Sequence, residues 1–259
     1  MKILAVIPAR YESTRFPGKP LADIAGKPMI QHVYERCLQA NTLSKVIVAT
    51  DNQLIYDVVK DFGGEVMVTS DRHRNGTSRC AEVADKFANE YDYIINIQGD
   101  EPLINPNQIN ELALLFKDAN AQITTQVKKE TDISLLKNRN IVKAIFETRF
   151  YDVPAITFLN KAALDAAFNS NFYATDFLRN GEHLSHLTHF YKHVGIYGFR
   201  TAVLKEIVAL APTRAEMAQQ LEQLRWLDHG FKIKIGITEH ETISVDTPDD
   251  LEKVRKLVL

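Results

Sequence analysis

Lys2-Ile-Leu-Ala-Val-Ile-Pro8 is a short apolar run, and Lys45-Val-Ile-Val-Ala-Thr50 repeats the pattern further along the chain. Each run has the length of a buried strand, and each is followed by apolar residues at helical spacing. Proline is expected to end the first strand at Pro8. Further runs at 65–69 and 91–97 continue the alternation. The first 116 residues therefore predict a β-α-β-α-β-α-β-α order, which is typical of a parallel sheet covered on both faces.

The pattern changes after Ala121, where the predicted strands are no longer all separated by helices. Strands are expected at 123–127, 141–146, 155–159, 193–199 and 231–237, and helices at 29–37, 55–62, 77–87, from Asn105 onward, at 216–228 and at 247–257. Thr247 and Pro248 are a cap residue and a first-turn proline for the last helix. The expected fold class is α/β, with a mostly parallel central sheet and a smaller mixed lobe.

Composition and charge exclude several classes of function. The chain has 259 residues, of which 45% are hydrophobic, and its 31 Lys and Arg nearly balance 33 Asp and Glu. A protein that holds a nucleic-acid backbone usually carries a basic excess, so no nucleic-acid partner is expected. The apolar runs are too short for a membrane span. Cys37 and Cys80 lack CxxC spacing, which favours a reducing, cytoplasmic compartment.

In an open parallel sheet, ligands bind beyond the carboxyl ends of the strands. The loop after the first predicted strand carries Arg10, Arg15 and Lys19 with small residues between them. Three cations and exposed backbone N–H groups there predict a polyphosphate clamp, although a solvated basic loop is the alternative. Neither GxxxxGK[ST] nor GxGxxG is present, so the standard nucleotide-binding loops are excluded.

Two aspartates are candidate metal ligands. Asp100 follows Gly99 directly after the fourth predicted strand, where a carboxylate suits an octahedral Mg²⁺ that bridges phosphate oxygens. Asp246 lies just before the closing helix. Taken alone, Asp100 could instead cap a turn, and Asp246 could cap that helix.

Two other groups of polar residues have alternative interpretations. Thr77 and Arg79 begin the third predicted helix, where they could hold a base, ribose or phosphate or belong to an ordinary capped turn. Four histidines suggest zinc, but their spacing is not HExxH and no acid accompanies them, so polar or substrate contacts are favoured. These are His183, His186, His189 and His193.

A set of motifs in fixed order resembles the 3-deoxy-manno-octulosonate cytidylyltransferase (CMP-Kdo synthetase) family. The motifs are Ile7-Pro-Ala-Arg-Tyr, Ser13-Thr-Arg-Phe-Pro-Gly-Lys-Pro-Leu, Gly26-Lys-Pro-Met-Ile, Val48-Ala-Thr-Asp, Gly76-Thr-Ser-Arg79, Gln98-Gly-Asp-Glu-Pro, Lys192-His-Val-Gly-Ile-Tyr-Gly-Phe-Arg200, Leu221-Glu-Gln-Leu-Arg225 and Val245-Asp-Thr-Pro-Asp-Asp-Leu251. The resemblance is dense over the first 116 residues and returns in the last third of the chain. Any one of these motifs alone is far less specific than the set.

The resemblance implies a Rossmann-like nucleotidyltransferase fold, a homodimer, CTP as nucleotide, Mg²⁺ as metal and a role in lipopolysaccharide or capsule synthesis. It implies a single domain over 1–259, with a nucleotide-binding half of about 1–120, a sugar-binding and dimerisation lobe of about 121–230 and a return to the core over about 231–259. The implied nucleotide-binding residues are Arg10, Ser13, Arg15, Lys19, Thr77, Arg79 and Gln98. The implied sugar-binding residues are Gln98, His193, Tyr197, Glu222 and Gln223, and the implied metal ligands are Asp100 and Asp246.

The expected reaction is transfer of CMP from CTP to a 3-deoxy-ulosonic acid, with release of pyrophosphate. Arg15, Lys19, Asp100 and Asp246 are the expected catalytic residues. Family members usually carry a Tyr-Phe-Ser-Arg segment followed by Ile-Pro, where this chain has Ala155-Ile-Thr-Phe-Leu-Asn-Lys-Ala-Ala163. Another acid sugar, such as an 8-amino or sialic-acid-like acceptor, is therefore an alternative. A catalytically silent CTP-binding homologue is another, whereas NAD-dependent oxidoreduction is disfavoured because the glycine fingerprint is absent.

Overall fold

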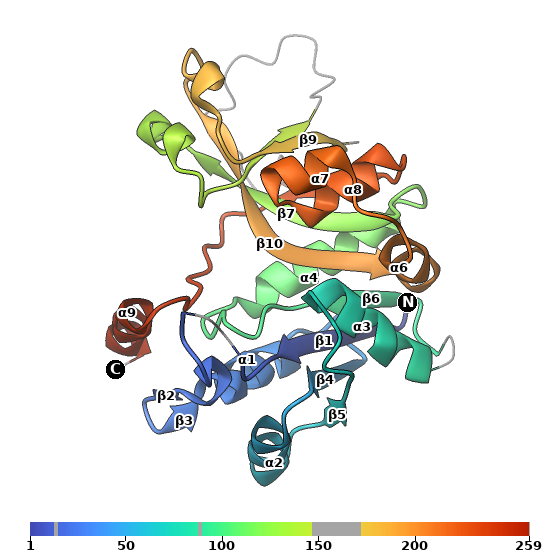
Figure 1. Cartoon of the computed structure of the whole chain (residues 1–259), viewed down its shortest axis with the longest axis vertical. Helices are drawn as coiled ribbons and strands as arrows, with labels where there is room; N and C mark the ends of the chain where they lie inside the picture. Colours follow the sequence, from blue (N-terminus) through green and yellow to red (C-terminus); the bar gives the residue numbers. More distant parts are fainter. Residues whose placement is uncertain (13–14, 88–89, 147–171, 259) are drawn as a thin grey trace. The chain divides into compact units, whose positions relative to one another are not determined.

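The computed structural model describes residues 1–12, 15–87, 90–146 and 172–258 (Figure 1). The chain divides into two compact units. The first unit comprises Met1–Ala113, Ile196–Val208 and His240–Leu259, and the second comprises Leu114–Gly195 and Ala209–Glu239. Among the described residues, no helix has both the length and the apolar composition that crossing a membrane would require.

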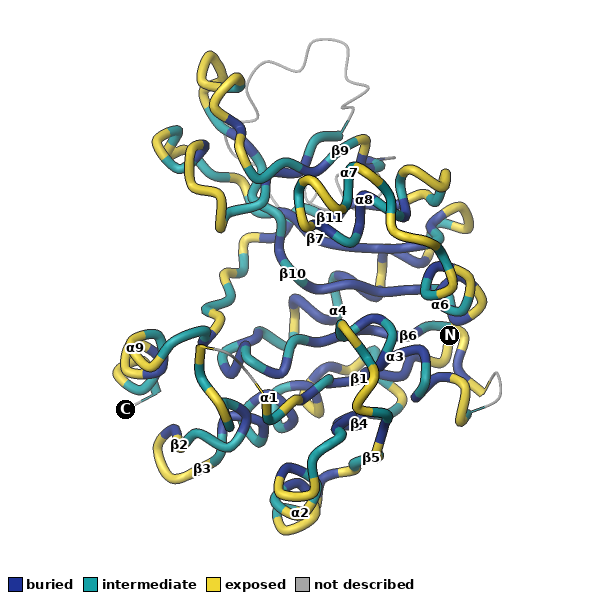
Figure 2. Tube along the Cα trace, in the orientation of Figure 1, coloured by how far each residue is buried: buried dark blue, intermediate teal, exposed yellow. Residues whose placement is uncertain are grey.

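A parallel sheet forms the centre of the first unit. Its strands are β1 (Ile3–Ala9), β4 (Lys45–Thr50), β5 (Val66–Val68) and β6 (Tyr93–Asn96). They lie in the order β6-β1-β4-β5 and are parallel, as the sequence predicts. The end of β10 (Phe190–Arg200) is antiparallel to β6. Most residues of β1, β4 and β6 are buried, which explains their continuous apolar sequence (Figure 2).

The predicted end of the first strand at Pro8 is wrong, because β1 continues to Ala9. The pairing of β1 with β6 ends at Val6, while the pairing with β4 continues through Pro8 and Ala9. Pro8 therefore lies where the strand is bound on one side only, and such a position tolerates a residue without an N–H group.

Helices of the first unit follow its strands. They are α1 (Met29–Leu38), α2 (Gln53–Asp61), α3 (Gly76–Lys86), α4 (Pro106–Leu114, whose last residue falls in the second unit), α6 (Thr201–Val208) and α9 (Pro248–Val258). All but α6 were predicted. Asn52 and Asn75 accept backbone hydrogen bonds that cap α2 and α3. A short hairpin of β2 (Asp23–Ile24) and β3 (Lys27–Pro28) was not predicted.

The second unit combines a parallel strand pair with antiparallel strands. The parallel strands are β7 (Ile123–Glu130) and β11 (Ile233–Ile237). The antiparallel strands are β8 (Lys143–Phe146), β9 (Ala174–Leu178) and the first part of β10. A mixed lobe was predicted here, although β9 was not. The strand expected at 155–159 lies outside the described residues.

The single helix predicted over 216–228 is wrong, because the structure has α7 (Arg214–Gln219) and α8 (Glu222–Asp228) instead. Gln220 separates them with a φ of 54°, in the left-handed region. The guanidinium of Arg179 donates to the carbonyl oxygens of Gln219 and Gln220 at 2.6 and 3.0 Å. These carbonyls at the end of α7 are thus bound by a side chain from β9's end rather than by a continuing helix.

Candidate active site

Three segments of the first unit bring two cations and two carboxylates together. The ammonium of Lys19 donates to Asp100 Oδ2 at 2.7 Å and lies 3.5 Å from Asp246 Oδ1. Arg15 Nη2 donates to the same Asp246 oxygen at 3.0 Å. The structure thus joins residues that the sequence separates by most of the chain, and it joins them at the carboxyl end of the sheet, where ligands of such folds bind.

Lys19 is positioned by a sharp turn. Gly18 has a φ of 69°, a conformation that glycine adopts without strain, and its N–H donates to the Tyr11 carbonyl at 2.8 Å. The turn leads into the short 3-10 helix η1 (Lys19–Leu21), with Pro20 in its first turn. Lys19 is therefore held at its backbone, while its long side chain extends to the carboxylates.

Asp100 is positioned by close packing of its loop against β1. A Cβ atom added to Gly99 would lie 2.7 Å from the Pro8 carbonyl oxygen, so only glycine fits there. The Val245 N–H donates to the Asp100 carbonyl at 2.9 Å, which fixes the Asp246 segment to the same loop. Val245 is itself fully buried in an apolar cluster of the first unit.

Helix α9 does not use Asp246 as its cap. Thr247 Oγ1 accepts from the Asp250 N–H at 3.3 Å, and Asp250 Oδ2 accepts from the Thr247 N–H at 3.1 Å. Hydrogen bonds from Lys253 and Thr247 lower the pKa of Asp250 to about 2. The predicted cap Thr247 is confirmed, and the Asp246 carboxylate faces Arg15 and Lys19 instead.

The two carboxylates fit a magnesium ion by their chemistry. Asp100 and Asp246 contribute hard oxygen donors that converge on one ammonium, so both are aimed at the same place. Mg²⁺ commonly takes one or two protein carboxylates and completes its octahedron with phosphate oxygens and water. Within the described ranges, no group of three or more His, Cys, Asp or Glu is arranged to hold a metal. A two-carboxylate site completed by a nucleotide agrees with that finding.

Glu101 is a site residue to which the sequence analysis assigned no role. Its side chain is buried, and burial, helped by the charge of Asp100, raises its pKa to about 8 against a hydrogen bond with Thr242. At neutral pH Glu101 is therefore mostly protonated. The signal in the sequence was weak, because an acid beside an acid normally indicates a solvated turn.

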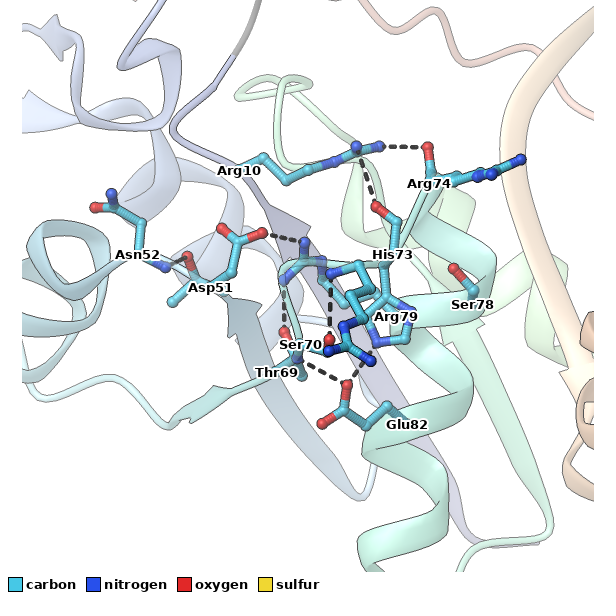
Figure 3. Close-up of polar contacts among 12 residues, drawn as sticks. Arg10, Asp51, Asn52, Thr69, Ser70, His73, Arg74, Ser78, Arg79 and Glu82 are labelled. Carbon is cyan, nitrogen blue, oxygen red and sulfur yellow. Dashed lines mark hydrogen bonds and ion pairs between the residues drawn. The ribbon is translucent and has the colours of Figure 1, made fainter.

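Arg10 and Arg79 bind protein atoms around the loop between β5 and α3 (Figure 3). Arg10 donates to the carbonyl oxygens of His73 and Arg74 at 3.4 and 3.0 Å. Arg79 is fully buried, and its guanidinium donates to Thr69 Oγ1 at 2.6 Å and to Asp51 Oδ2 at 2.5 Å. Both arginines therefore hold this loop through contacts with protein atoms.

The same loop is fixed by a carboxylate from α3. Glu82 Oε2 accepts from the Ser70 N–H at 2.9 Å and lies 2.5 Å from His73 Nε2 (Figure 3). Thr77 is buried in the first turn of α3. Gln98 lies in the loop that carries Asp100. Ser13, the remaining predicted nucleotide contact, lies outside the described residues.

The predicted sugar-binding residues are distributed over both units. Tyr197 is buried on β10 in the first unit. In the second unit, His193 Nε2 lies 2.9 Å from Thr125 Oγ1, and burial lowers the pKa of His193 to about 3, which keeps it neutral. Glu222 and Gln223 form the first turn of α8, where Glu222 lies 4.0 Å from Arg225.

Comparison with known proteins identifies the family. A family profile described as Cytidylyltransferase matches residues 4–235. A 3-deoxy-manno-octulosonate cytidylyltransferase of Parabacteroides distasonis is 49% identical over 259 residues, which cover 98% of this chain and 96% of that protein. One of Geobacter metallireducens is 44% identical over 255 residues, with shares of 98% and 96%.

Similar solved structures point to the same family. The structure of a CMP:2-keto-3-deoxy-manno-octonic acid synthetase complexed with CTP has a TM-score of 0.85 and 37% identity, covering 100% of this chain and 98% of that one. A cytidylyltransferase of Leptospira borgpetersenii, with 17% identity and a TM-score of 0.62, covers 100% of this chain and 87% of that one, and it shares the fold. Because the profile and the relatives span nearly the whole chain, this protein belongs to the cytidylyltransferase family.

Proposed function

We propose that this chain transfers CMP from CTP to 3-deoxy-manno-octulosonate and releases pyrophosphate. Its family makes it a nucleotidyltransferase, and its relatives at 41–49% identity bear the name of this activity. The observation that carries the proposal is a cluster of ion pairs in the first unit, in which Lys19 and Arg15 contact Asp100 and Asp246. That arrangement offers cations for phosphate oxygens beside carboxylates for a metal ion.

The reaction is an in-line attack of a sugar hydroxyl on the α-phosphorus of CTP. Phosphoryl chemistry of this kind needs positioning and charge neutralisation more than covalent participation by the protein. Lys19 and Arg15 hold the phosphates and stabilise the charge that develops on pyrophosphate. Mg²⁺, when held by Asp100 and Asp246, supplies further charge neutralisation and lowers the pKa of the attacking hydroxyl.

The proposal extends to the pathway, the oligomeric state and the location of the protein. A role in lipopolysaccharide or capsule synthesis is proposed from the family resemblance. A homodimer is proposed from the family resemblance, and light scattering on the purified protein measures it. A cytoplasmic location is supported by Cys37 and Cys80, which form no disulfide, as is usual for proteins of a reducing compartment.

The test is an assay of the purified chain with CTP, Mg²⁺ and 3-deoxy-manno-octulosonate. We expect pyrophosphate release and a CMP-sugar product by mass spectrometry. An 8-amino analogue and a sialic acid are run in parallel. Faster turnover with either would replace the proposed acceptor, and CTP binding without turnover on any acid sugar would indicate a catalytically silent homologue.

Asp100→Asn and Asp246→Asn should each lower kcat by about 10²–10³-fold, since each removes a proposed ligand of the metal ion that would neutralise charge on the transferring group. Asp249→Asn is the matched control, because it replaces an exposed carboxylate of α9 close to Asp246 in the chain. It should leave kcat near that of the unmodified chain. Pyrophosphate release close to normal in either site variant would remove that residue from the proposed metal site.

A further inference from the structure

The charged groups of the candidate active site neutralise one another within the protein. Lys19 contacts both Asp100 and Asp246, and Arg15 contacts Asp246. In the proposed function, the two cations bind phosphate and the two carboxylates bind a divalent metal ion. The groups that would bind the two ligands are therefore partners of each other, and each ligand has to compete with a contact that already exists.

Lys19 is the central member of this cluster. Its side chain is 14% exposed, whereas that of Arg15 is 65% exposed, and of these two cations only Lys19 reaches both aspartates. An ammonium ion bound at 2.7 Å to Asp100 Oδ2 occupies one of the two oxygens that this carboxylate could offer to a metal ion. Because both are compact cations, they compete for the same negative charge.

The carboxylates are more firmly placed than the lysine. The loop of Asp100 is packed against the Pro8 carbonyl through Gly99 and is bonded to Val245. The Asp246 segment continues into α9, whose first turn is closed by Thr247 and Asp250. The Lys19 ammonium is at the end of a flexible four-carbon side chain. An exchange of partners would therefore move the lysine and leave the aspartates in place.

We infer that Lys19 is an exchangeable internal cation that occupies the carboxylates of Asp100 and Asp246 until nucleotide phosphates draw it away. This inference rests on the proposed function, because it takes CTP and a divalent metal ion as the ligands. The exchange makes the two ligands cooperative. CTP releases the aspartates for the metal, and by linkage the metal releases Lys19 for CTP. The protein alone binds metal weakly at this site.

The test measures Mn²⁺ binding to the protein without nucleotide, by the electron paramagnetic resonance signal of the free ion. Lys19→Gln removes the competing ammonium, and we expect its Mn²⁺ affinity to rise about 5-fold or more, the range of ordinary coupling between sites. The gain should disappear in the double variant Lys19→Gln/Asp100→Asn. Unchanged or weaker Mn²⁺ binding by Lys19→Gln overturns the inference, as does a gain that survives in the double variant.

Arg10→Gln is the matched control. It removes the same charge from the same loop, but Arg10 donates to backbone carbonyls and contacts neither aspartate. Its Mn²⁺ affinity should stay near that of the unmodified chain. An equal gain in Arg10→Gln would mean that net charge, rather than direct contact, controls metal binding, and it would overturn the inference.

A second measurement addresses the nucleotide without any metal. In the presence of EDTA, Asp100→Asn frees Lys19 from its closer partner, so CTP should bind this variant more tightly than the unmodified chain. Equal or weaker binding counts against the exchange. The proposed function has a separate test: it fails if the unmodified chain releases no pyrophosphate from CTP and an acid sugar. Neither binding measurement depends on that assay.

Discussion

Arg79 carries a charge into the interior of the first unit. Its side chain is completely buried, and its guanidinium is bonded to the carboxylate of Asp51 at the end of β4 and to the hydroxyl of Thr69 just after β5. A buried charge needs such partners, because its transfer out of water costs several kcal/mol. Arg79 therefore fixes the first turn of α3 against two strand ends, next to the residues predicted to bind the nucleotide.

Arg79→Met should lower the free energy of unfolding by about 3–5 kcal/mol, because it leaves Asp51 in a largely buried place without its cation. Urea denaturation followed by circular dichroism measures the change. Arg72→Met is the control, since Arg72 is exposed in the same loop, and it should stay within about 0.5 kcal/mol of the unmodified chain. A loss in Arg79→Met no larger than that of Arg72→Met would contradict the structural role.

For single residues, the sequence indicated which side chains belong to the candidate site but not which groups they contact. Arg10, Lys19 and Asp100 were chosen because they follow strands of a predicted parallel sheet, and they do lie at its carboxyl end. Their partners depend on distances between segments far apart in the chain. Nothing local in the sequence indicates that Arg10 donates to the His73 and Arg74 carbonyls, or that Lys19 contacts both aspartates.

The loop after β6 shows how one element constrains another. Gly99 precedes Asp100, and its backbone packs directly against the end of β1. The group that this backbone approaches is the Pro8 carbonyl oxygen, which leaves no room for a side chain at position 99. The position of Asp100 is thus set by contact between the ends of two neighbouring strands.

Gly99→Ala should lower the free energy of unfolding by about 1–3 kcal/mol, because the new methyl group would lie too close to a backbone atom that cannot move away alone. It should also weaken CTP binding in the presence of Mg²⁺, since the displaced loop carries Asp100. Denaturation and calorimetric titration measure the two effects. Gly195→Ala in β10 is the control, because a Cβ atom there meets nothing within 4 Å, and equal effects in both variants would refute the steric argument.

Some helix ends can be predicted from neighbouring residues in the sequence, and others cannot. Thr247 and Pro248 predicted the start of α9, and the structure has the cap and the helix there, because capping is decided by neighbouring residues. The break at Gln220 was not predicted. No glycine or proline marks it, and the side chain that binds the exposed carbonyls, Arg179, comes from another part of the second unit.

For the whole chain, the order of strands and helices was more predictable than their pairing. The apolar runs predicted the observed bounds of β4 and those of β1 to within two residues, because both strands are buried on two faces and their composition shows it. Helix α6 was missed because Thr201 follows β10 directly, without a turn residue between strand and helix. The antiparallel pairing of β10 with β6 joins distant segments, so no local pattern indicates it.

Stability of the chain in acid should depend in part on a buried ion pair of the second unit. Lys234 Nζ lies 2.6 Å from Asp118 Oδ2, which also accepts from the Tyr173 hydroxyl at 2.7 Å. Burial opposes ionisation of Asp118, but hydrogen bonds from Lys234, the Asn120 N–H and Tyr173 lower its pKa from 3.8 to about 2. A carboxylate whose pKa is lower in the folded state stabilises that state above its unfolded pKa, and it loses this contribution as the pH falls through the folded value.

Asp118→Asn should therefore lower the free energy of unfolding by about 2–3 kcal/mol near neutral pH, where the unmodified chain has its full ion pair. The difference between the two proteins should begin to shrink below about pH 4 and be mostly gone at about pH 2. Urea denaturation at a series of pH values measures it. Asp71→Asn, which replaces an exposed carboxylate, should show no difference at any pH. A difference in Asp118→Asn that is constant with pH would mean that the Asp118 side chain stabilises the fold by its shape and not by its charge.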